Sequence, residues 1–193
     1  EVNDAAGGNQ IASLDLADGA TLNGPGAVVL RQRTDGDFTA DFGAAAGAVA
    51  TIAANATVRG QGRVTGTLTN LGTIGAGTGN GPSIYGIITQ QGNGRLFAGE
   101  VASVGQAVSI FSGSVTGGTI ETTGAGIAYA YNGGSTSNVT LNGRMRVQPS
   151  STHTIQAGGF TVGAGSTLEV NDAAGGNQIA SLDLADGATL NGP

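Results

Sequence analysis

Short stretches of this chain alternate between apolar and polar residues. In residues 37–42, the side chains of Phe38, Ala40 and Phe42 are expected to face one side and the Asp and Thr side chains the other. The same alternation runs through residues 13–16, 63–69, 139–141 and 144–147. A period of two is typical of a strand with one buried face, so the pattern predicts many short strands with small or aliphatic inward residues.

Turn signals separate these stretches at short intervals. Asn and Gly cluster at residues 23–26, 80–82, 93–94, 132–134 and 142–143, and both tolerate the left-handed backbone conformation that a sharp corner requires. Frequent Gly argues against helices, and even the Ala-rich residues 44–54, which Gly47 interrupts, are expected to form one short helical turn at most. The sequence therefore predicts an all-β protein.

Two arrangements of short strands compete. A β-sandwich or antiparallel barrel needs large side chains between its sheets, whereas this chain has 37 Gly, five Phe, three Tyr and no Trp. A parallel β-helix has a narrow interior that Val, Ile, Leu and Ala fill by stacking on themselves. We therefore predict a parallel β-helix, or β-solenoid.

The chain repeats itself. Residues 1–25 recur without a substitution as residues 169–193, so the sequence divides into one unit at 1–168 and the start of an identical unit at 169–193. It reads as a window from a longer tandem array, although an engineered duplication would give the same letters. With coils of about 18 to 24 residues, one unit would hold roughly seven to nine coils. Eight coils of 21 residues divide evenly and would rise about 38 Å.

The composition limits the kinds of partner that the chain could bind. Charged residues make up only 10% of the chain, and residues 1–168 hold nine acidic and seven basic residues, for a net charge of −2. This weak charge and the absence of a basic patch argue against nucleic acid as a partner. No apolar run is long enough for a membrane span, which argues against membrane insertion, and without Cys there is neither a disulfide framework nor a thiolate metal site.

Several stretches resemble a known class of bacterial surface protein. Residues 66–74, 117–120 and 163–170 are rich in Gly, Thr and Asn, and they resemble the coils of autotransporter passengers and filamentous-haemagglutinin-like adhesins. The resemblance extends over the whole chain and is one of composition. It implies a right-handed parallel β-helix on the bacterial surface, in a stalk, adhesin or biofilm component. Identity between neighbouring units points further, to a giant fibre-forming surface protein.

Few residues suggest chemistry. The one His, His153, lies among Ser and Thr, and we expect it to be exposed on a polar strand or bend and not part of a Ser/His/Asp triad. Asp35, Asp37 and Asp41 form the densest acidic cluster, in which Asp37 and Asp41 would share an outward face. Such carboxylates could serve a glycosidase or bind Ca²⁺, but a solvated face is the preferred interpretation. No Lys, Tyr or Trp nearby is expected to offer a platform for a sugar, and Arg31 and Arg33 are expected to neutralise the cluster.

Other candidate motifs are weak. Residues 4–9 and 15–19 superficially resemble Ca²⁺ loops but lack the ligand spacing of known calcium motifs, so they are interpreted as corners. The Gly-rich residues 75–81 lack the Lys of a phosphate-binding loop. We therefore predict no catalytic, cofactor-binding or metal-binding residues and no cofactor.

The predicted function is structural. We expect an extracellular bacterial filament or stalk in which identical units stack end to end, with a role in surface attachment or a biofilm matrix. Lateral bundling with other filaments is a further option. An adhesin that binds host glycans is the first alternative, and loops projecting at residues 75–82 or 132–137 would favour it. A polysaccharide-degrading enzyme on the same fold is the second.

Overall fold

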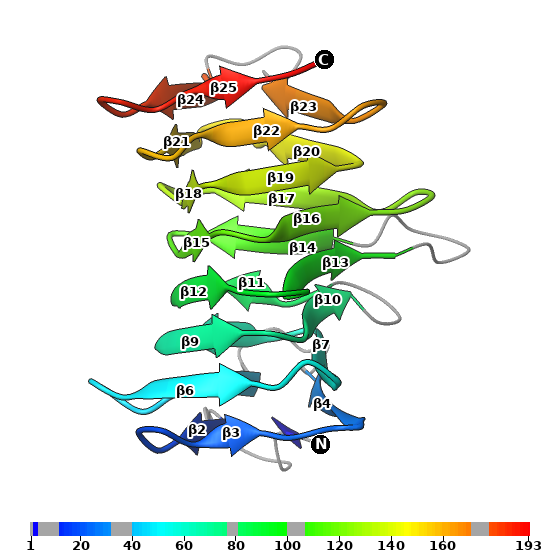
Figure 1. The fold of residues 1–193 in the computed structure, drawn as a ribbon, viewed down its shortest axis with the longest axis vertical. Coiled ribbons are helices and arrows are strands. Elements are labelled where there is room, and N and C mark those ends of the chain that lie inside the picture. The colour runs from blue at the N-terminus through cyan, green and yellow to red at the C-terminus, as the bar shows by residue number, and fades with distance from the viewer. Residues whose placement is uncertain (1, 4–11, 32–39, 77–80, 100–106, 171–177) are drawn as a thin grey trace.

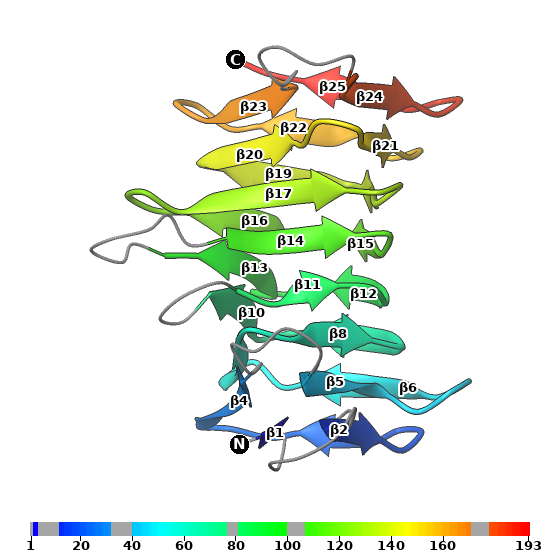
Figure 2. The same cartoon turned by 180° about the vertical axis from the view of Figure 1, so that it is seen from behind.

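The chain coils into a three-sided column of stacked β-strands (Figures 1 and 2). This computed structural model describes residues 2–3, 12–31, 40–76, 81–99, 107–170 and 178–193. All pairings between neighbouring strands are parallel, and the described residues contain no helix. Each coil contributes one strand to each of three sheets. The predicted right-handed parallel β-helix is confirmed.

Sheet A has nine strands, which run from one end of the column to the other. They are β1 (Val2–Asn3), β4 (Gly26–Arg31), β7 (Ala56–Gly60), β10 (Thr73–Ala76), β13 (Arg95–Ala98), β16 (Thr119–Thr122), β19 (Val139–Asn142), β22 (Phe160–Val162) and β25 (Leu190–Asn191).

Sheet B has eight strands, seen from behind in Figure 2. They are β2 (Ala12–Leu16), β5 (Ala40–Ala44), β8 (Arg63–Thr65), β11 (Ser83–Ile84), β14 (Ala107–Phe111), β17 (Ile127–Tyr131), β20 (Arg144–Val147) and β23 (Thr167–Val170).

Sheet C also has eight strands. They are β3 (Thr21–Leu22), β6 (Val49–Ile52), β9 (Thr67–Asn70), β12 (Ile87–Gln90), β15 (Ser114–Thr116), β18 (Ser135–Ser137), β21 (Thr152–Ile155) and β24 (Ser181–Leu184).

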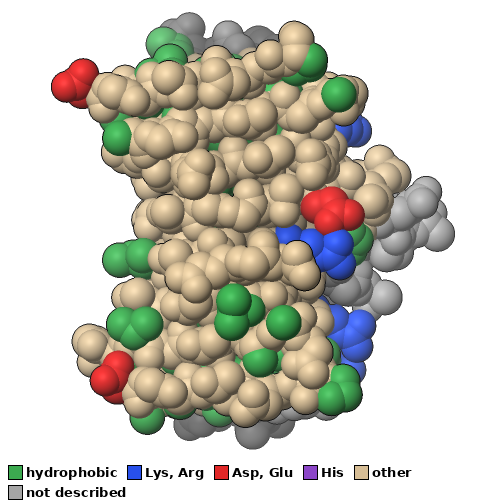
Figure 3. Space-filling view, in the orientation of Figure 1, with side chains coloured by type: hydrophobic (Ala, Val, Ile, Leu, Met, Phe, Trp, Pro, Cys, Tyr) green, Lys and Arg blue, Asp and Glu red, His purple; other side chains and the backbone are tan. Residues whose placement is uncertain are grey.

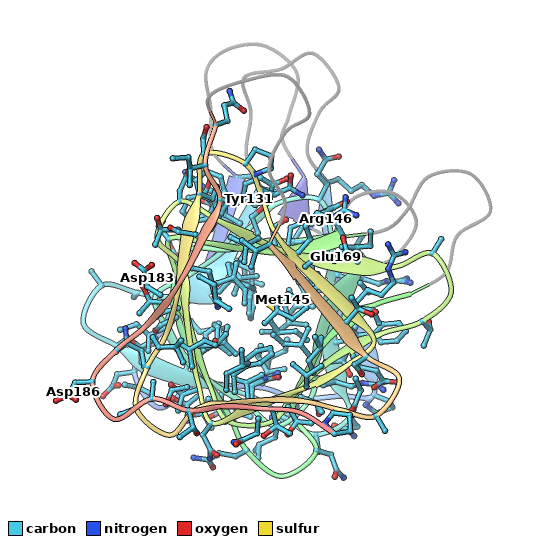
Figure 4. The ribbon with its side chains drawn as sticks, turned by 90° about the horizontal axis from the view of Figure 1, so that it is seen from above. Tyr131, Met145, Arg146, Glu169, Asp183 and Asp186 are labelled. Atoms are coloured by element: carbon cyan, nitrogen blue, oxygen red, sulfur yellow. The ribbon has the colours of Figure 1, made fainter. Side chains whose placement is uncertain are left out.

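The interior is a continuous aliphatic column, seen end-on in Figure 4. Because the strands pair in register, the same inward position in successive coils holds residues that stack directly on one another. In sheet A, Ile74, Leu96 and Ile120 follow each other in this way and are fully buried. Burying each such side chain contributes about 1.5 to 3 kcal/mol. The predicted filling by Val, Ile, Leu and Ala is therefore correct, with Phe42, Met145 and Phe160 as larger additions.

Two buried amides hold the corner between sheets C and A. Asn70 and Gln90 occupy equivalent inward positions on β9 and β12. The Asn70 side chain accepts a hydrogen bond from the Gly72 amide and donates one to the Arg95 carbonyl, while Gln90 donates to the Gly117 carbonyl. Buried backbone groups at a bend need such partners because they cannot reach water. The amides therefore supply hydrogen-bond partners to backbone groups at this corner.

Residues 63–69, predicted as one alternating strand, form two. β8 and β9 belong to different sheets, and the chain turns between them at Gly66, which has φ of +70°. Val64 and Leu68 are both fully buried, so the predicted inward residues are correct although the strand is not continuous. A Cβ at Gly66 would overlap the carbonyl oxygen of Ala44 in the coil below. The corner therefore requires glycine for both its φ and its close approach.

Coil length varies, so the even division into eight coils of 21 residues is wrong. In sheet A, Leu30 pairs with Gly60, which gives a coil of 30 residues, and Val58 pairs with Ile74, which gives one of 16. From β1 to β23, the strand that holds the copy of Val2, the chain advances by 22 strands. At three strands a coil, a 168-residue unit is seven and one-third coils, within the predicted seven to nine.

Replacing Gly66 by Ala should lower the free energy of unfolding by at least about 2 kcal/mol, because Ala would take a left-handed conformation and overlap a fixed carbonyl. Urea denaturation followed by circular dichroism measures this. The control is Gly26→Ala: Gly26 lies in a strand with ordinary φ and open space at its Cβ position, and its change should stay within about 0.5 kcal/mol. Equal losses in the two variants would contradict the corner argument.

Candidate functional site

Aromatic side chains gather on the outer surface of sheet B. The strand register places Tyr85 of the β11–β12 corner next to Phe111 of β14, and Phe111 next to Tyr131 of β17. Ring centroids lie 4.9 Å apart for Tyr85 and Phe111, 5.6 Å for Phe111 and Tyr131, and 5.9 Å for Tyr129 and Tyr131. We call these four residues the aromatic strip. At these distances the rings attract one another in addition to burying area.

A second outward column on the same sheet runs beside the strip. Ser83 and Ser109 lie in register in its middle, with Arg63 in the coil below and Tyr129 in the coil above. Because serines are small and the neighbouring rings are large, the surface is hollowed along this column. The hollow has a volume of about 420 Å³, and we call it the sheet-B groove. It is lined by Gln61, Gly62, Arg63, Gly81, Ser83, Tyr85, Ala107, Ser109, Phe111, Tyr129 and Tyr131.

An ion pair fixes one end of the groove. Arg63 donates to both carboxylate oxygens of Asp41, with Nε to Oδ1 at 2.8 Å and Nη2 to Oδ2 at 2.6 Å. The hydrogen bond to Asp41 is the main cause that raises the pKa of Arg63. The guanidinium also lies 5.8 Å from the centre of the Tyr85 ring. This two-point contact holds Arg63 rigid, so its remaining donor groups are pre-positioned at the groove.

The aromatic strip overturns one expectation from the sequence. Asp41 was expected to lack any aromatic neighbourhood that could hold a sugar, yet Tyr85 lies over the arginine that binds it. Asp41 is neutralised by Arg63. Asp35, Asp37 and Arg33 lie outside the described residues, so the predicted roles of the acidic cluster and of Arg31 and Arg33 stay untested.

The described lining of the groove offers aromatic faces, hydroxyls and one guanidinium. Aromatic faces beside a few convergent polar groups suit the binding of a flat or ring-shaped polar molecule. The Tyr131 hydroxyl stays protonated to higher pH than usual, since burial raises its pKa.

No family model, curated protein or solved structure matches this chain. The site must therefore be interpreted from its own residues.

His153 is buried, and the prediction that it is exposed is wrong. It lies on β21 with 1% of its surface exposed, and its Nε2 is 3.0 Å from the Thr136 hydroxyl of the preceding coil. Its Nδ1 has no hydrogen-bond partner among the described residues. Burial lowers the pKa of His153 to about 4, so the ring is neutral at physiological pH. Enclosed in the column, it cannot reach a substrate.

The remaining candidates are corners or lie outside the described residues. Residues 15–19 form the end of β2 and a turn in which the Ala20 amide donates to the Ala17 carbonyl at 3.0 Å, with Gly19 at φ of +70°. The corner interpretation is correct there, while residues 4–9 are not described. Residues 132–134 make a tight turn into β18, so the part of the chain that the structure describes has no projecting loop at residues 132–137.

Charge on the surface is sparse. On the face shown in Figure 3, charged side chains are few and most of the surface is uncharged. Within the described ranges, no group of three His, Asp or Glu residues could hold a metal ion. A search of the same ranges finds no helix of the length and apolar character needed to cross a membrane.

The second copy of the repeat joins the first through an ion pair on sheet B (Figure 4). Glu169, the first residue of the copy, lies in register with Arg146 and accepts a hydrogen bond from its Nε at 2.6 Å, while Nη2 forms an ion pair with the same oxygen at 2.6 Å. Arg144 lies 3.5 Å from the other carboxylate oxygen. The hydrogen bond from Arg146 is the main cause that lowers the pKa of Glu169. Two arginines of one unit thus bind the first residue of the next.

Stability should depend on pH through His153. Its pKa is about 4 in the fold and about 6.5 when unfolded, so the unfolded chain binds more protons between these values. The contribution of neutral His153 to the free energy of unfolding should be fully present well above pH 6.5. It should shrink as the pH is lowered, with a loss of about 2 kcal/mol at pH 5. Urea titrations at pH 7.5 and pH 5 measure the loss. In the double variant Thr136→Val/His153→Leu the loss should shrink strongly, and an unchanged loss would contradict this assignment.

Proposed function

We propose that this protein is a segment of an extracellular structural filament or stalk, built from tandem β-solenoid units that stack end to end. One observation supports this most directly: the described residues of the second copy continue the stack by one coil and form the same corner turn as in the first copy. The two corner turns agree, with Ala20 N to Ala17 O at 3.0 Å and Ala188 N to Ala185 O at 2.9 Å.

Both sides of a junction between units occur within this one chain. The lower edge of the second copy pairs with β20, β21 and β22, which belong to the first unit. The upper edge of the first copy pairs with β4, β5 and β6. Because the two copies have the same sequence, the open upper edge of the second copy carries the groups that bind β4 to β6 in the first.

One side chain illustrates this complementarity. The Asp18 carboxylate accepts a hydrogen bond from the Val49 amide of the next coil at 3.0 Å. Its copy, Asp186, projects from a corner of the last coil (Figure 4). A following unit would bring an identical amide to Asp186. Strand edges attract further strands unless they are covered. A long array therefore covers all its edges except those at its two ends.

Chains of one, two and three units, each followed by residues 1–25, should form rods whose length grows by about 35 Å per unit, from seven and one-third coils at about 4.8 Å each. Electron microscopy of negatively stained particles measures this. The matched control inserts a Gly-Ser linker of about ten residues between Leu168 and Glu169, which should give separate segments joined flexibly. Rods that do not lengthen in proportion to unit number would contradict the filament proposal.

The sheet-B groove supports a second candidate function, binding of a polysaccharide along the outside of the filament. The ring faces can stack on the apolar faces of sugar rings, while Arg63 and the serine hydroxyls can bond sugar hydroxyls. This differs from the adhesin considered from sequence, because strand faces and not projecting loops would make the contact. Surface attachment and matrix formation would both be served by such binding.

In native gels that each contain one polysaccharide from a panel of acidic and neutral kinds, migration of the chain should be retarded by at least one of them. The Tyr85→Ser/Phe111→Ser variant should bind that polysaccharide at least about tenfold more weakly, a loss of about 1.4 kcal/mol. The control is Ile87→Ser, which removes an apolar side chain that is 54% exposed on sheet C, away from the groove. Equal retardation of both variants, or retardation by no member of the panel, would reject the sugar-binding function.

A further inference from the structure

The two copies of the 25-residue segment lie on different sheets. In the first copy, β1, β2 and β3 belong to sheets A, B and C; in the second, β23, β24 and β25 belong to sheets B, C and A. Ser13 of β2 pairs with Asp41 in sheet B, whereas its copy Ser181 pairs with Thr152 in sheet C. The shift follows from the length of the unit, since 22 strands exceed seven complete coils by one strand.

The 25-residue segment can occupy either set of sheets because its own residues form the corner turn. Gly19 and its copy Gly187 have φ of +70° and +73°, and both turns close with the same backbone hydrogen bond. The neighbours differ: inward Leu14 lies beside Phe42, whereas its copy Leu182 lies beside His153. The local sequence therefore determines the bend, and any of the three sides accepts the strands that follow it.

The column also twists. In Figure 1, the sheet C strands β3, β6 and β9 face the viewer at one end, but β15, β18 and β24 lie at the left edge further along. Sheet A moves correspondingly, from β4 and β7 at the right edge to β22 and β25 facing the viewer. Such rotation is the usual result of the twist between neighbouring strands. At the C-terminal end, sheet A therefore faces the side that sheet C faces at the N-terminal end.

The twist and the shift act in opposite directions. Figure 1 shows β25 facing the viewer at one end as its counterpart β3 does at the other, with β24 and β2 both to the left. Figure 2, from behind, shows β23 and β1 on the same side as each other. We infer that successive units in an array are related almost by translation alone, because the one-strand excess of each unit cancels the twist that the unit accumulates.

This inference rests on the proposed tandem array and adds a consequence for its surface. A strip that stays on one sheet would wind around a twisted fibre. With the one-strand shift, the aromatic strip moves to the next sheet in each unit and returns to the same side of the fibre, about every 35 Å. The fibre would therefore present its sheet-B grooves, and the equivalent grooves of later units, in one line. A single polysaccharide chain that runs along the fibre could then contact all of them.

The sheet shift can be tested in the 193-residue chain, which contains no native Cys. The hydroxyl oxygens of Thr152 and Ser181 lie 2.8 Å apart on in-register strands, a separation that suits a disulfide after Thr152→Cys/Ser181→Cys. Oxidation should convert nearly all of this variant to the cross-linked form, seen as loss of free thiol and faster migration in a denaturing gel.

The control is Arg146→Cys/Ser181→Cys. If a unit held a whole number of coils, Ser181 would lie in sheet B, where its counterpart Ser13 lies. In sheet B, the outward positions in register with Ser13 run through Asp41 and Arg63 and reach Arg146, so Ser181 would then neighbour Arg146. This second variant should keep its thiols free. Cross-linking of Arg146→Cys/Ser181→Cys in place of Thr152→Cys/Ser181→Cys would overturn the shift.

The cancellation itself is tested on rods of three or more units by helical reconstruction from cryo-electron micrographs. We expect a rise of about 35 Å per unit with a rotation near zero. A rotation near one-third of a turn in either direction would overturn the inference while leaving the filament intact. If rods do not form but the Thr152→Cys/Ser181→Cys bond does, the filament proposal fails and the sheet shift within the chain stands.

Discussion

The structure depends on parallel pairing of each coil with the coil below it, in register. Inward side chains then meet their counterparts one coil away, as Ile74, Leu96 and Ile120 do, and the strands between the two end coils are paired on both edges. The same constraint acts on the outside. Tyr85, Phe111 and Tyr131 form a strip, and Arg146 meets Glu169, because register brings those positions together. Core, groove and junction are thus consequences of one pattern of hydrogen bonds.

Much of the fold could be predicted from short-range sequence patterns. Alternation identifies the inward residues, so Val64, Leu68, Leu141 and Val147 are buried as their positions imply. It does not show where a strand changes sheet: residues 63–69 alternate without a break, and only the left-handed conformation at Gly66 divides them. His153 was misplaced for a different reason. Its polar neighbours suggest an outward face, but it is two residues from Ile155 and therefore has the same inward parity.

The groove could not be predicted, since it depends on which residues share a register position. Tyr85, Phe111 and Tyr131 are separated by 26 and then 20 residues, and no fixed period connects them. The ion pair of Asp41 with Arg63 likewise joins residues that are 22 positions apart. Coils of unequal length conceal such neighbours from any analysis of one sequence. The identity of residues 1–25 and 169–193 is visible in the letters, but their placement on different sheets follows only from counting strands.

Unequal coils also separate the length of the polypeptide from the height of the column. The coil from Leu30 to Gly60 holds nearly twice as many residues as the coil from Val58 to Ile74, yet each adds a single strand to sheet A. The segments between strands differ in length, since β4 ends at Arg31 and β5 begins at Ala40, whereas β7 ends at Gly60 and β8 begins at Arg63. A gene could therefore gain or lose codons between two strands without altering the fibre's axial spacing. A foreign peptide inserted at such a position would be displayed once per repeat, at a fixed axial interval.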